Sequence, residues 1–167
     1  LSFYMQARED TIILTASEKK FYIYAFNPTD GTPQWEQVSD WPSADHSGHI
    51  QHPVLAGDRL YLEPRAFELA TGEVLPGKIG ARSGCTTYIA STDALIYRGA
   101  NRKISIWDPG SGEVTGWTRL RPSCWLSVIA AGGLLQVPEG GAGCSCGGWM
   151  ETSLAFAPRV IDEEEEK

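Results

Sequence analysis

Several kinds of segment are missing from this chain, and each absence excludes a class of protein. No stretch approaches 18 consecutive apolar residues, so no transmembrane helix is expected. Lysine and arginine number 14 against 21 acidic residues and form no basic stripe, and the net charge of −7 makes nucleic acid and anionic membranes poor partners. No segment shows the periodicity of an amphipathic helix. These absences favour an all-β globular protein.

The chain also lacks an initiator methionine and a recognisable signal peptide at its start, Leu1-Ser2-Phe3. A processed protein or a fragment of a larger one is expected to begin in this way. At the other end, the acidic run from Asp162 to Lys167 predicts a disordered, solvated tail. We therefore expect an ordered domain over residues 1–158 and an acidic tail over residues 159–167.

Glycine and proline, by contrast, are abundant, with 18 and 10 copies, which suits many short strands joined by turns. Three of the glycines recur at nearly equal steps, because Gly31, Gly72 and Gly112 are 41 and 40 residues apart. Each glycine is the centre of a similar turn, with the sequences DGT, TGE and SGE. Self-similarity at a period near 40 residues is typical of an array of supersecondary units.

Each unit is predicted to hold four short strands. Two apolar strands flank a tight turn, which is expected at 57–58, 92–93 and 132–133, with a weaker copy within 7–14. A third strand with alternating apolar residues is expected at 21–26, 66–69, 104–107 and 153–157. A fourth strand is expected after the glycine-centred turn, near Trp35, at 74–75 and at 114–117. Four strands in about 40 residues are typical of the blades of a β-propeller.

The turns resemble the blade ends of the pyrroloquinoline-quinone-like (PQQ-like) propeller family. The resemblance is carried by residues 25–35 (AFNPTDGTPQW), 67–75 (FELATGEVL) and 106–114 (IWDPGSGEV). It implies a β-propeller of four-stranded antiparallel blades. Members carry about seven or eight blades, whereas this chain has about four, so the ring is incomplete. We expect either the C-terminal part of a larger propeller or a second chain that completes the ring, because open blade edges are a liability.

In the resembled family, the segment before each unit's first strand leads to the central channel. Aligning the third and fourth units on Leu95 and Leu134, an offset of 39 residues, matches the two Arg-x-x-Cys sequences, 82–85 and 121–124. Aligning the second and third units on Leu60 and Leu95, an offset of 35, brings the histidine-rich segment beside them. The resemblance and this register together predict a cluster of reactive side chains at one mouth of the channel.

The histidines and arginines of this cluster are candidates for binding a metal or an anion. All three histidines of the chain lie within seven positions, at His46, His49 and His52. On a strand their spacing would turn successive rings to opposite faces, so they converge only if the segment loops. Two of them with an outside ligand would hold zinc or a similar divalent metal, and the alternative is a surface loop with unrelated histidines. Arg82 and Arg121 either bind a carboxylate or phosphate or pair with acidic residues of neighbouring blades.

The four cysteines leave three alternatives open. The first is disulfides in an extracytoplasmic domain, where the register above favours Cys85 with Cys124. Cys144 and Cys146 are too close in sequence to favour bonding each other, so cross-pairing with the other two is also open. The second is a four-thiolate metal site, although the spacing is poor for zinc. The third is free, buried thiols.

The function expected from these features is a non-catalytic binding or scaffold module of a periplasmic or secreted protein. Trp125 and Trp149 are candidates for stacking on its ligand, since they accompany the cysteines, whereas most other tryptophans are expected to pack between blades. One alternative is a fragment of a quinoprotein dehydrogenase, but the resemblance implies an adjacent cysteine pair in such enzymes and none is present, so bound PQQ is not expected. Another is a metal-assisted lyase or hydrolase acting on an acidic polysaccharide, where Arg82 and Arg121 would neutralise the uronate and a histidine or tyrosine would be the base.

Overall fold

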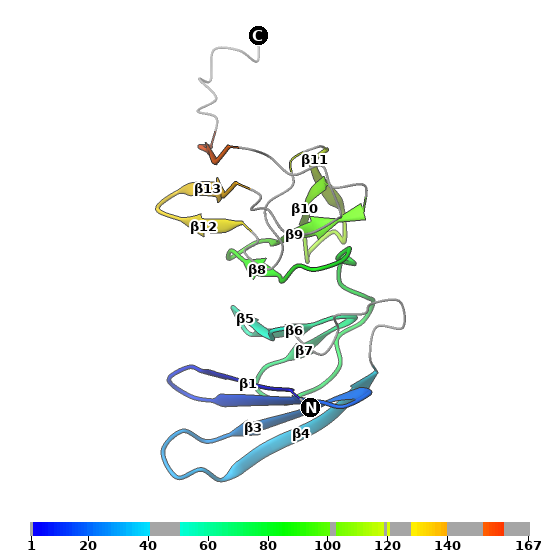
Figure 1. Ribbon diagram of the computed structural model, residues 1–167. Helices are drawn as coiled ribbons and strands as arrows, with labels where there is room; N and C mark the ends of the chain where they lie inside the picture. Colours follow the sequence, from blue (N-terminus) through cyan, green and yellow to red (C-terminus); the bar gives the residue numbers. More distant parts are fainter. Residues whose placement is uncertain are drawn as a thin grey trace.

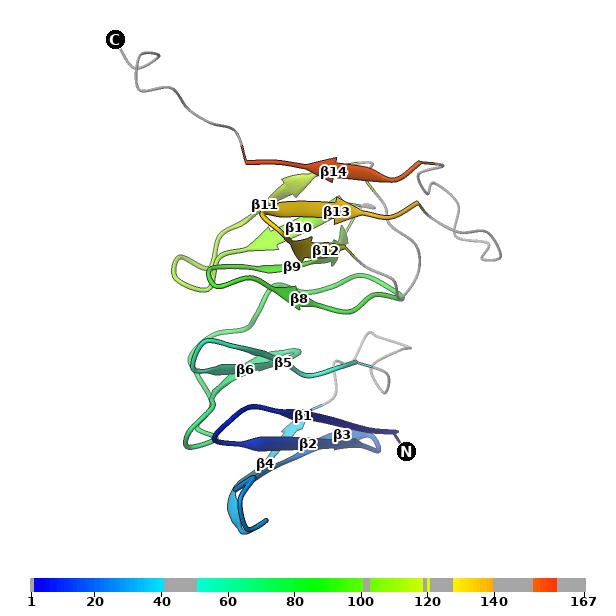
Figure 2. The ribbon, with the colours of Figure 1, turned by 90° about the vertical axis from the view of Figure 1, so that its left-hand side faces the viewer.

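The computed structural model describes residues 2–40, 51–100, 103–118, 120, 128–139 and 152–158. The strands in these ranges form four antiparallel sheets, which we call blades 1 to 4 in chain order. Figures 1 and 2 show the blades following one another from the blue end of the chain to the orange end. Among the described residues, no helix is long and apolar enough to cross a membrane.

The strands are short and each is paired with its sequence neighbour. Blade 1 contains β1 (Ser2–Ala7), β2 (Ile12–Ser17), β3 (Lys20–Phe26) and β4 (Pro33–Asp40). Blade 2 contains β5 (Val54–Ala56), β6 (Arg59–Leu62) and β7 (Arg65–Glu68). Blade 3 contains β8 (Ile89–Ala90), β9 (Leu95–Gly99), β10 (Lys103–Trp107) and β11 (Val114–Trp117). Blade 4 contains β12 (Ile129–Ala131), β13 (Leu134–Val137) and β14 (Leu154–Phe156).

The all-β prediction is confirmed, and the predicted hairpins occur where expected. Their turns lie between β5 and β6, between β8 and β9, and between β12 and β13. The fourth strand predicted for blade 2 is reduced to one isolated bridge between Phe67 and Val74. In blade 4 the described residues supply three strands.

The glycine-centred turn has the same backbone geometry in three blades. The amide of each central glycine donates to the carbonyl four residues earlier, in the pairs Gly31–Asn27 (2.9 Å), Gly72–Glu68 (2.8 Å) and Gly112–Asp108 (2.8 Å). The φ angles of these glycines are 72°, 73° and 74°, a left-handed conformation that a Cβ disfavours. The repeat seen in the sequence is therefore a repeat of one hydrogen-bonded turn.

Each blade buries one face against the next, and these three contacts make up the core. We call the side of a blade that meets the preceding blade its front face, and the side that meets the following blade its back face. Between blades 1 and 2 the cluster contains Ile13, Phe21, Ile23, Ala25, Leu60, Leu62, Phe67 and Leu69. Between blades 2 and 3 it contains Tyr61, Ala66, Ile79, Tyr88, Leu95, Tyr97 and Trp107. Between blades 3 and 4 it contains Ile96, Ile104, Val128 and Val137, with Leu135 and Phe156 packed against them.

The strand pairing corrects one predicted register. Leu60 and Leu95 both lie on front faces, which agrees with the offset of 35 residues between blades 2 and 3. In blade 4 the front-face residue is Leu135, whereas Leu134 points the other way and is 38% exposed. The offset between blades 3 and 4 is therefore 40 residues, and the predicted 39 is wrong. Two leucines were matched by identity, but alternate strand residues face opposite sides of the sheet.

Candidate functional site

A buried polar network joins blade 2 to the loop that leads into blade 3. Arg82 Nε donates to Glu63 Oε2 at 2.9 Å, and Arg82 Nη1 donates to the carbonyls of Gly84 and Thr86 at 3.2 and 2.9 Å. Glu63 also accepts a bond from Gln51 Nε2 at 3.2 Å. Glu63 and Arg82 are only 6% and 7% exposed. The pair therefore holds the loop before β8 against the turn between β6 and β7.

Two tyrosines lie beside this network and keep their protons. The Tyr88 hydroxyl donates to the Gly80 carbonyl at 2.7 Å. Burial, and then the negative charge of Glu63, raise the pKa of Tyr88 far above its ordinary value. Burial likewise raises the pKa of Tyr97. Neither hydroxyl is therefore suited to take up a proton as a general base near neutral pH.

Three of the predicted site residues are described by the structure, and all precede the first strand of a blade. Arg82 pairs with an acidic residue of the preceding blade, which is one of the two roles predicted for it. His52 lies against Tyr4 of β1, with ring centroids 4.0 Å apart, and partial burial lowers the pKa of His52. Cys85 is half-buried, three residues after Arg82. Arg82 and Cys85 lie between β7 and β8, whereas His52 lies just before β5.

The other predicted site residues lie outside the described residues. They are His46, His49, Arg121, Cys124, Trp125, Cys144, Cys146 and Trp149. In the part of the chain that is described, no group of three or more His, Cys, Asp or Glu side chains is arranged to hold a metal ion. The metal, disulfide, anion-binding and stacking roles assigned to these eight residues stay predictions.

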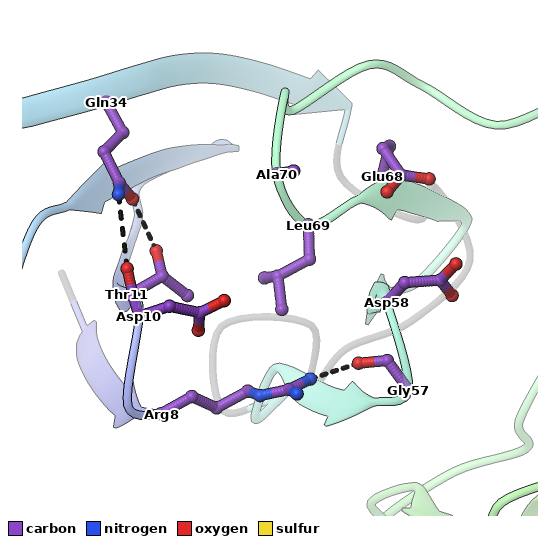
Figure 3. Close-up of a pocket in the computed structure, with 9 residues that line it drawn as sticks. All are labelled: Arg8, Asp10, Thr11, Gln34, Gly57, Asp58, Glu68, Leu69 and Ala70. Carbon is purple, nitrogen blue, oxygen red and sulfur yellow. Dashed lines mark hydrogen bonds between the residues drawn. The ribbon is translucent and has the colours of Figure 1, made fainter.

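A polar pocket lies between blades 1 and 2, on the side of the hairpin turns (Figure 3). Its volume is about 360 Å³, and it is lined by Arg8, Asp10, Thr11, Gln34, Gly57, Asp58, Glu68, Leu69 and Ala70. Arg8 reaches across from blade 1, and its guanidinium donates to the Gly57 carbonyl of blade 2. On the blade 1 side of the pocket, the Thr11 hydroxyl donates to Gln34 Oε1 at 2.7 Å, and Gln34 Nε2 donates to the Asp10 carbonyl at 3.2 Å. Two blades and three turns thus build the pocket.

Carboxylates outnumber cations around this pocket. Asp10, Asp58 and Glu68 contribute three negative charges. Arg8 is the single cation among the lining residues, and Arg59 lies next to the pocket with its Nε 3.7 Å from Asp58 Oδ1, so a net negative charge remains. A surplus of negative charge in a hollow between two blades favours a positively charged group. This pocket was not predicted from the sequence. The hairpin turns that line it were predicted, but the packing of blade 1 on blade 2 decides that these turns lie next to each other.

A second, apolar hollow of about 720 Å³ lies between blades 3 and 4. Trp117 of β11 stacks on Phe156 of β14 at its edge, with centroids 5.2 Å apart and rings 9° from parallel. Apolar side chains of both blades therefore remain accessible at this hollow.

No protein-family model and no curated protein matches the chain. A solved structure does match it, the β-propeller BamB from Moraxella catarrhalis, with a TM-score of 0.51 and 15% sequence identity. The alignment covers 77% of this chain and 39% of BamB. The chain has a β-propeller fold. The propeller is an incomplete ring that spans less than half the length of BamB, and at this level of identity the likeness shows the fold and not an activity.

Proposed function

We propose that this propeller is a non-catalytic binding or scaffold module of a larger assembly, and that it holds a partner at the pocket between blades 1 and 2. The pocket itself carries the proposal, since side chains from two blades meet there around about 360 Å³. Asp10, Asp58 and Glu68 suit the ammonium or guanidinium group of a partner's lysine or arginine. The rigid blades fix the pocket in advance, which lowers the entropy cost of binding.

The surroundings of Arg82 support binding over the polysaccharide-lyase alternative. A lyase of that kind needs a guanidinium that faces the substrate carboxylate, whereas Arg82 is buried and bonded to Glu63. The raised pKa values of Tyr88 and Tyr97 also disfavour these hydroxyls as the base. Among the described residues, no arrangement of side chains supports the lyase or the dehydrogenase alternative over a binding module.

The partner proposal is tested by titrating the protein with a short oligolysine peptide. Trp35 reports on binding, because its indole N–H donates to the Leu69 carbonyl at 2.9 Å and Leu69 lines the pocket. We expect a saturable change in tryptophan fluorescence that weakens as salt is added. Asp58→Asn and Glu68→Gln should each weaken binding by about 3- to 10-fold.

Glu113→Gln is the matched control, because Glu113 follows the equivalent glycine-centred turn of blade 3, away from the pocket. It removes one negative charge without changing the pocket and should leave the affinity unchanged. Equal weakening by Glu113→Gln and Glu68→Gln would mean that only net charge attracts the peptide. Binding of an oligoglutamate peptide with the same affinity would also contradict the proposal.

We further propose that the module is of the PQQ-like type, that it lies in the periplasm or is secreted, and that its cysteines form disulfides. The blade-end resemblance and the propeller fold support this, and the proposed boundaries remain 1–158 for the blades and 159–167 for the tail. Alkylation of the denatured protein with and without reductant counts its thiols by mass. Four labels that appear only after reduction are expected, whereas four labels without reductant would contradict the disulfides. Stoichiometric zinc in the purified protein would favour the metal site instead.

A further inference from the structure

The front face of blade 1, the side that points away from blade 2, is open and mainly apolar, with Glu36 beside Tyr24 as an exposed carboxylate on it. The strand registers place Phe3, Met5 and Tyr22 on this face, together with Val38 of β4, which pairs with Tyr22. These four side chains are 59%, 70%, 36% and 54% exposed. Single apolar residues are ordinary on a protein surface, but a contiguous apolar sheet face marks an interaction site.

The same face is buried in the other blades. In blade 1, Phe26 pairs with Ile12, and the equivalent pairs are Phe67 with Leu60 in blade 2 and Trp107 with Leu95 in blade 3. Phe67 and Leu60 are fully buried, and Leu95 and Trp107 are 1% and 8% exposed. In each case the preceding blade covers them. The front face of blade 1 is therefore built as a blade-packing face.

A front face packs on the back face of another blade, and the back face of blade 4 is the one left open. The back face of blade 4 carries Ile129, 50% exposed, and Leu134, 38% exposed, on the side of the sheet opposite to Leu135 and Val137. Figure 1 shows blade 1 and blade 4 at opposite ends of the molecule, so one copy does not bring the two faces together. The described chain thus presents one open front face and one open back face.

We propose that a second copy of this chain completes the ring, with the back face of blade 4 in each copy packed on the front face of blade 1 in the other. The front-to-back contact already occurs three times within the chain, and the two open faces are its two halves. Two copies of four blades give eight, and propellers typically have about four to eight blades. Such a head-to-tail contact closes when the second copy is added. The inference rests on the proposed role as a module of a larger assembly and names a second copy as one component of it, separate from the partner proposed for the pocket between blades 1 and 2.

The test is the molar mass in solution, measured by size-exclusion chromatography with light scattering over a range of concentrations. The unmodified chain should have twice the chain mass in the tens of micromolar. Met5→Lys on the front face and Ile129→Lys on the back face should each weaken the dimer by about tenfold or more, since each leaves a charge in an apolar contact. Val114→Lys is the matched control, because Val114 is 42% exposed on the outer strand of an internal blade, and it should leave the dimer unchanged.

Mixing the variants distinguishes head-to-tail packing from other contacts. The Met5→Lys chain keeps its back face and the Ile129→Lys chain keeps its front face, so an equimolar mixture should restore a dimer with one interface. A monomer at every concentration, a dimer that only Met5→Lys weakens, or a series of larger polymers would each overturn the closed ring. The oligolysine titration of the same samples tests the pocket, which contains none of these substituted residues, so the two proposals fail separately.

Discussion

Glu63 and Arg82 form an ion pair that is almost completely removed from solvent. Glu63→Gln leaves the Arg82 charge buried against a neutral amide, so we expect the free energy of unfolding to fall by about 3–5 kcal/mol. Arg82→Met should cost a similar amount. The double variant should be more stable than the sum of the two single effects predicts, because the second change removes the uncompensated charge. Urea unfolding followed by circular dichroism measures the free energy of unfolding of each variant. Strictly additive losses would contradict a direct interaction between Glu63 and Arg82.

Asp108 closes the glycine-centred turn of blade 3 with its side chain. Its Oδ1 accepts bonds from the amides of Gly110 and Ser111 at 2.6 and 3.3 Å, and the Ser111 hydroxyl donates to Oδ2 at 2.9 Å. The Gly110 amide, followed by the Ser111 groups, holds the pKa of the Asp108 carboxyl below its ordinary value. The native carboxylate therefore contributes stability that is present above about pH 4 and is lost as the pH falls through the native pKa.

Asp108→Asn tests the sign of this contribution. The variant should unfold at lower urea than the unmodified chain at pH 6, and the difference should shrink as the pH is lowered below about 4. The midpoint of urea unfolding at a series of pH values gives the comparison. A difference that stays constant over this range would show that the ionised carboxylate is not the cause.

The partner of Arg82 illustrates why single-residue roles were only partly predictable. The sequence left an outside anion and an acidic residue of a neighbouring blade as alternatives for this guanidinium. Glu63 lies 19 positions earlier, at the end of the hairpin of another blade, and nothing local in the sequence links the two residues. Arg82 pairs with Glu63 because the loop before β8 packs against blade 2.

Among the structural elements, the glycine-centred turn of blade 2 is locked by its neighbour. Trp35 of β4 donates its indole N–H to the Leu69 carbonyl, and a Cβ at Gly72 would lie 2.5 Å from the Trp35 ring. Gly31 has nearly the same φ, 72° against 73°, but nothing lies within 4 Å of its Cβ position. The two positions therefore share the backbone requirement and differ in the contact.

Gly72→Ala and Gly31→Ala separate these two effects. Gly31→Ala should lower the free energy of unfolding by about 1–2 kcal/mol through backbone strain alone. Gly72→Ala should cost about 1–3 kcal/mol more, because the ring of Trp35 must also move. Urea unfolding gives both costs, and tryptophan fluorescence of the folded Gly72→Ala variant should shift. Equal costs at the two positions would show that the contact with Trp35 contributes nothing.

Elements with a local signature were predicted, and those that depend on neighbours were not. The hairpin turns and the alternating third strands were found because glycine, turn residues and period-two alternation act within a few residues. The expected strand at 74–75 is a single bridge, since Val74 pairs only with Phe67. The register of blade 4 was wrong by one residue because the buried face of a strand, and not the identity of one leucine, decides which positions correspond.

For the whole molecule, the repeat was sufficient to predict an incomplete propeller, because each unit carries its own pattern of strands and turns. The pocket between blades 1 and 2 was not predictable in the same way. Its carboxylates at positions 10, 58 and 68 come from three separate turns, and their meeting depends on the angle between two blades. The predicted cluster at the channel mouth rests largely on residues outside the described ranges, so it remains a prediction.

Stability should differ along the row of blades. All five residues of β9 in blade 3 are buried, whereas β12 is exposed throughout and Val137 is the one buried residue among the described strands of blade 4. In a repeat array, a terminal unit with one neighbour opens more readily than an internal unit with two. We therefore expect amides of β13 to exchange with solvent about tenfold or more faster than amides of β9 in dilute protein.

Hydrogen exchange at two protein concentrations then connects this gradient to the proposed ring. If a second copy covers the back face of blade 4 and the front face of blade 1, higher concentration should slow exchange in β12, β13 and β1, because binding stabilises the covered state. Exchange in β9 should change less, because blades 2 and 4 already flank its blade. In the Met5→Lys chain the concentration dependence should disappear while the difference between β13 and β9 remains. Uniform exchange along the row would show that the four blades unfold as one cooperative unit.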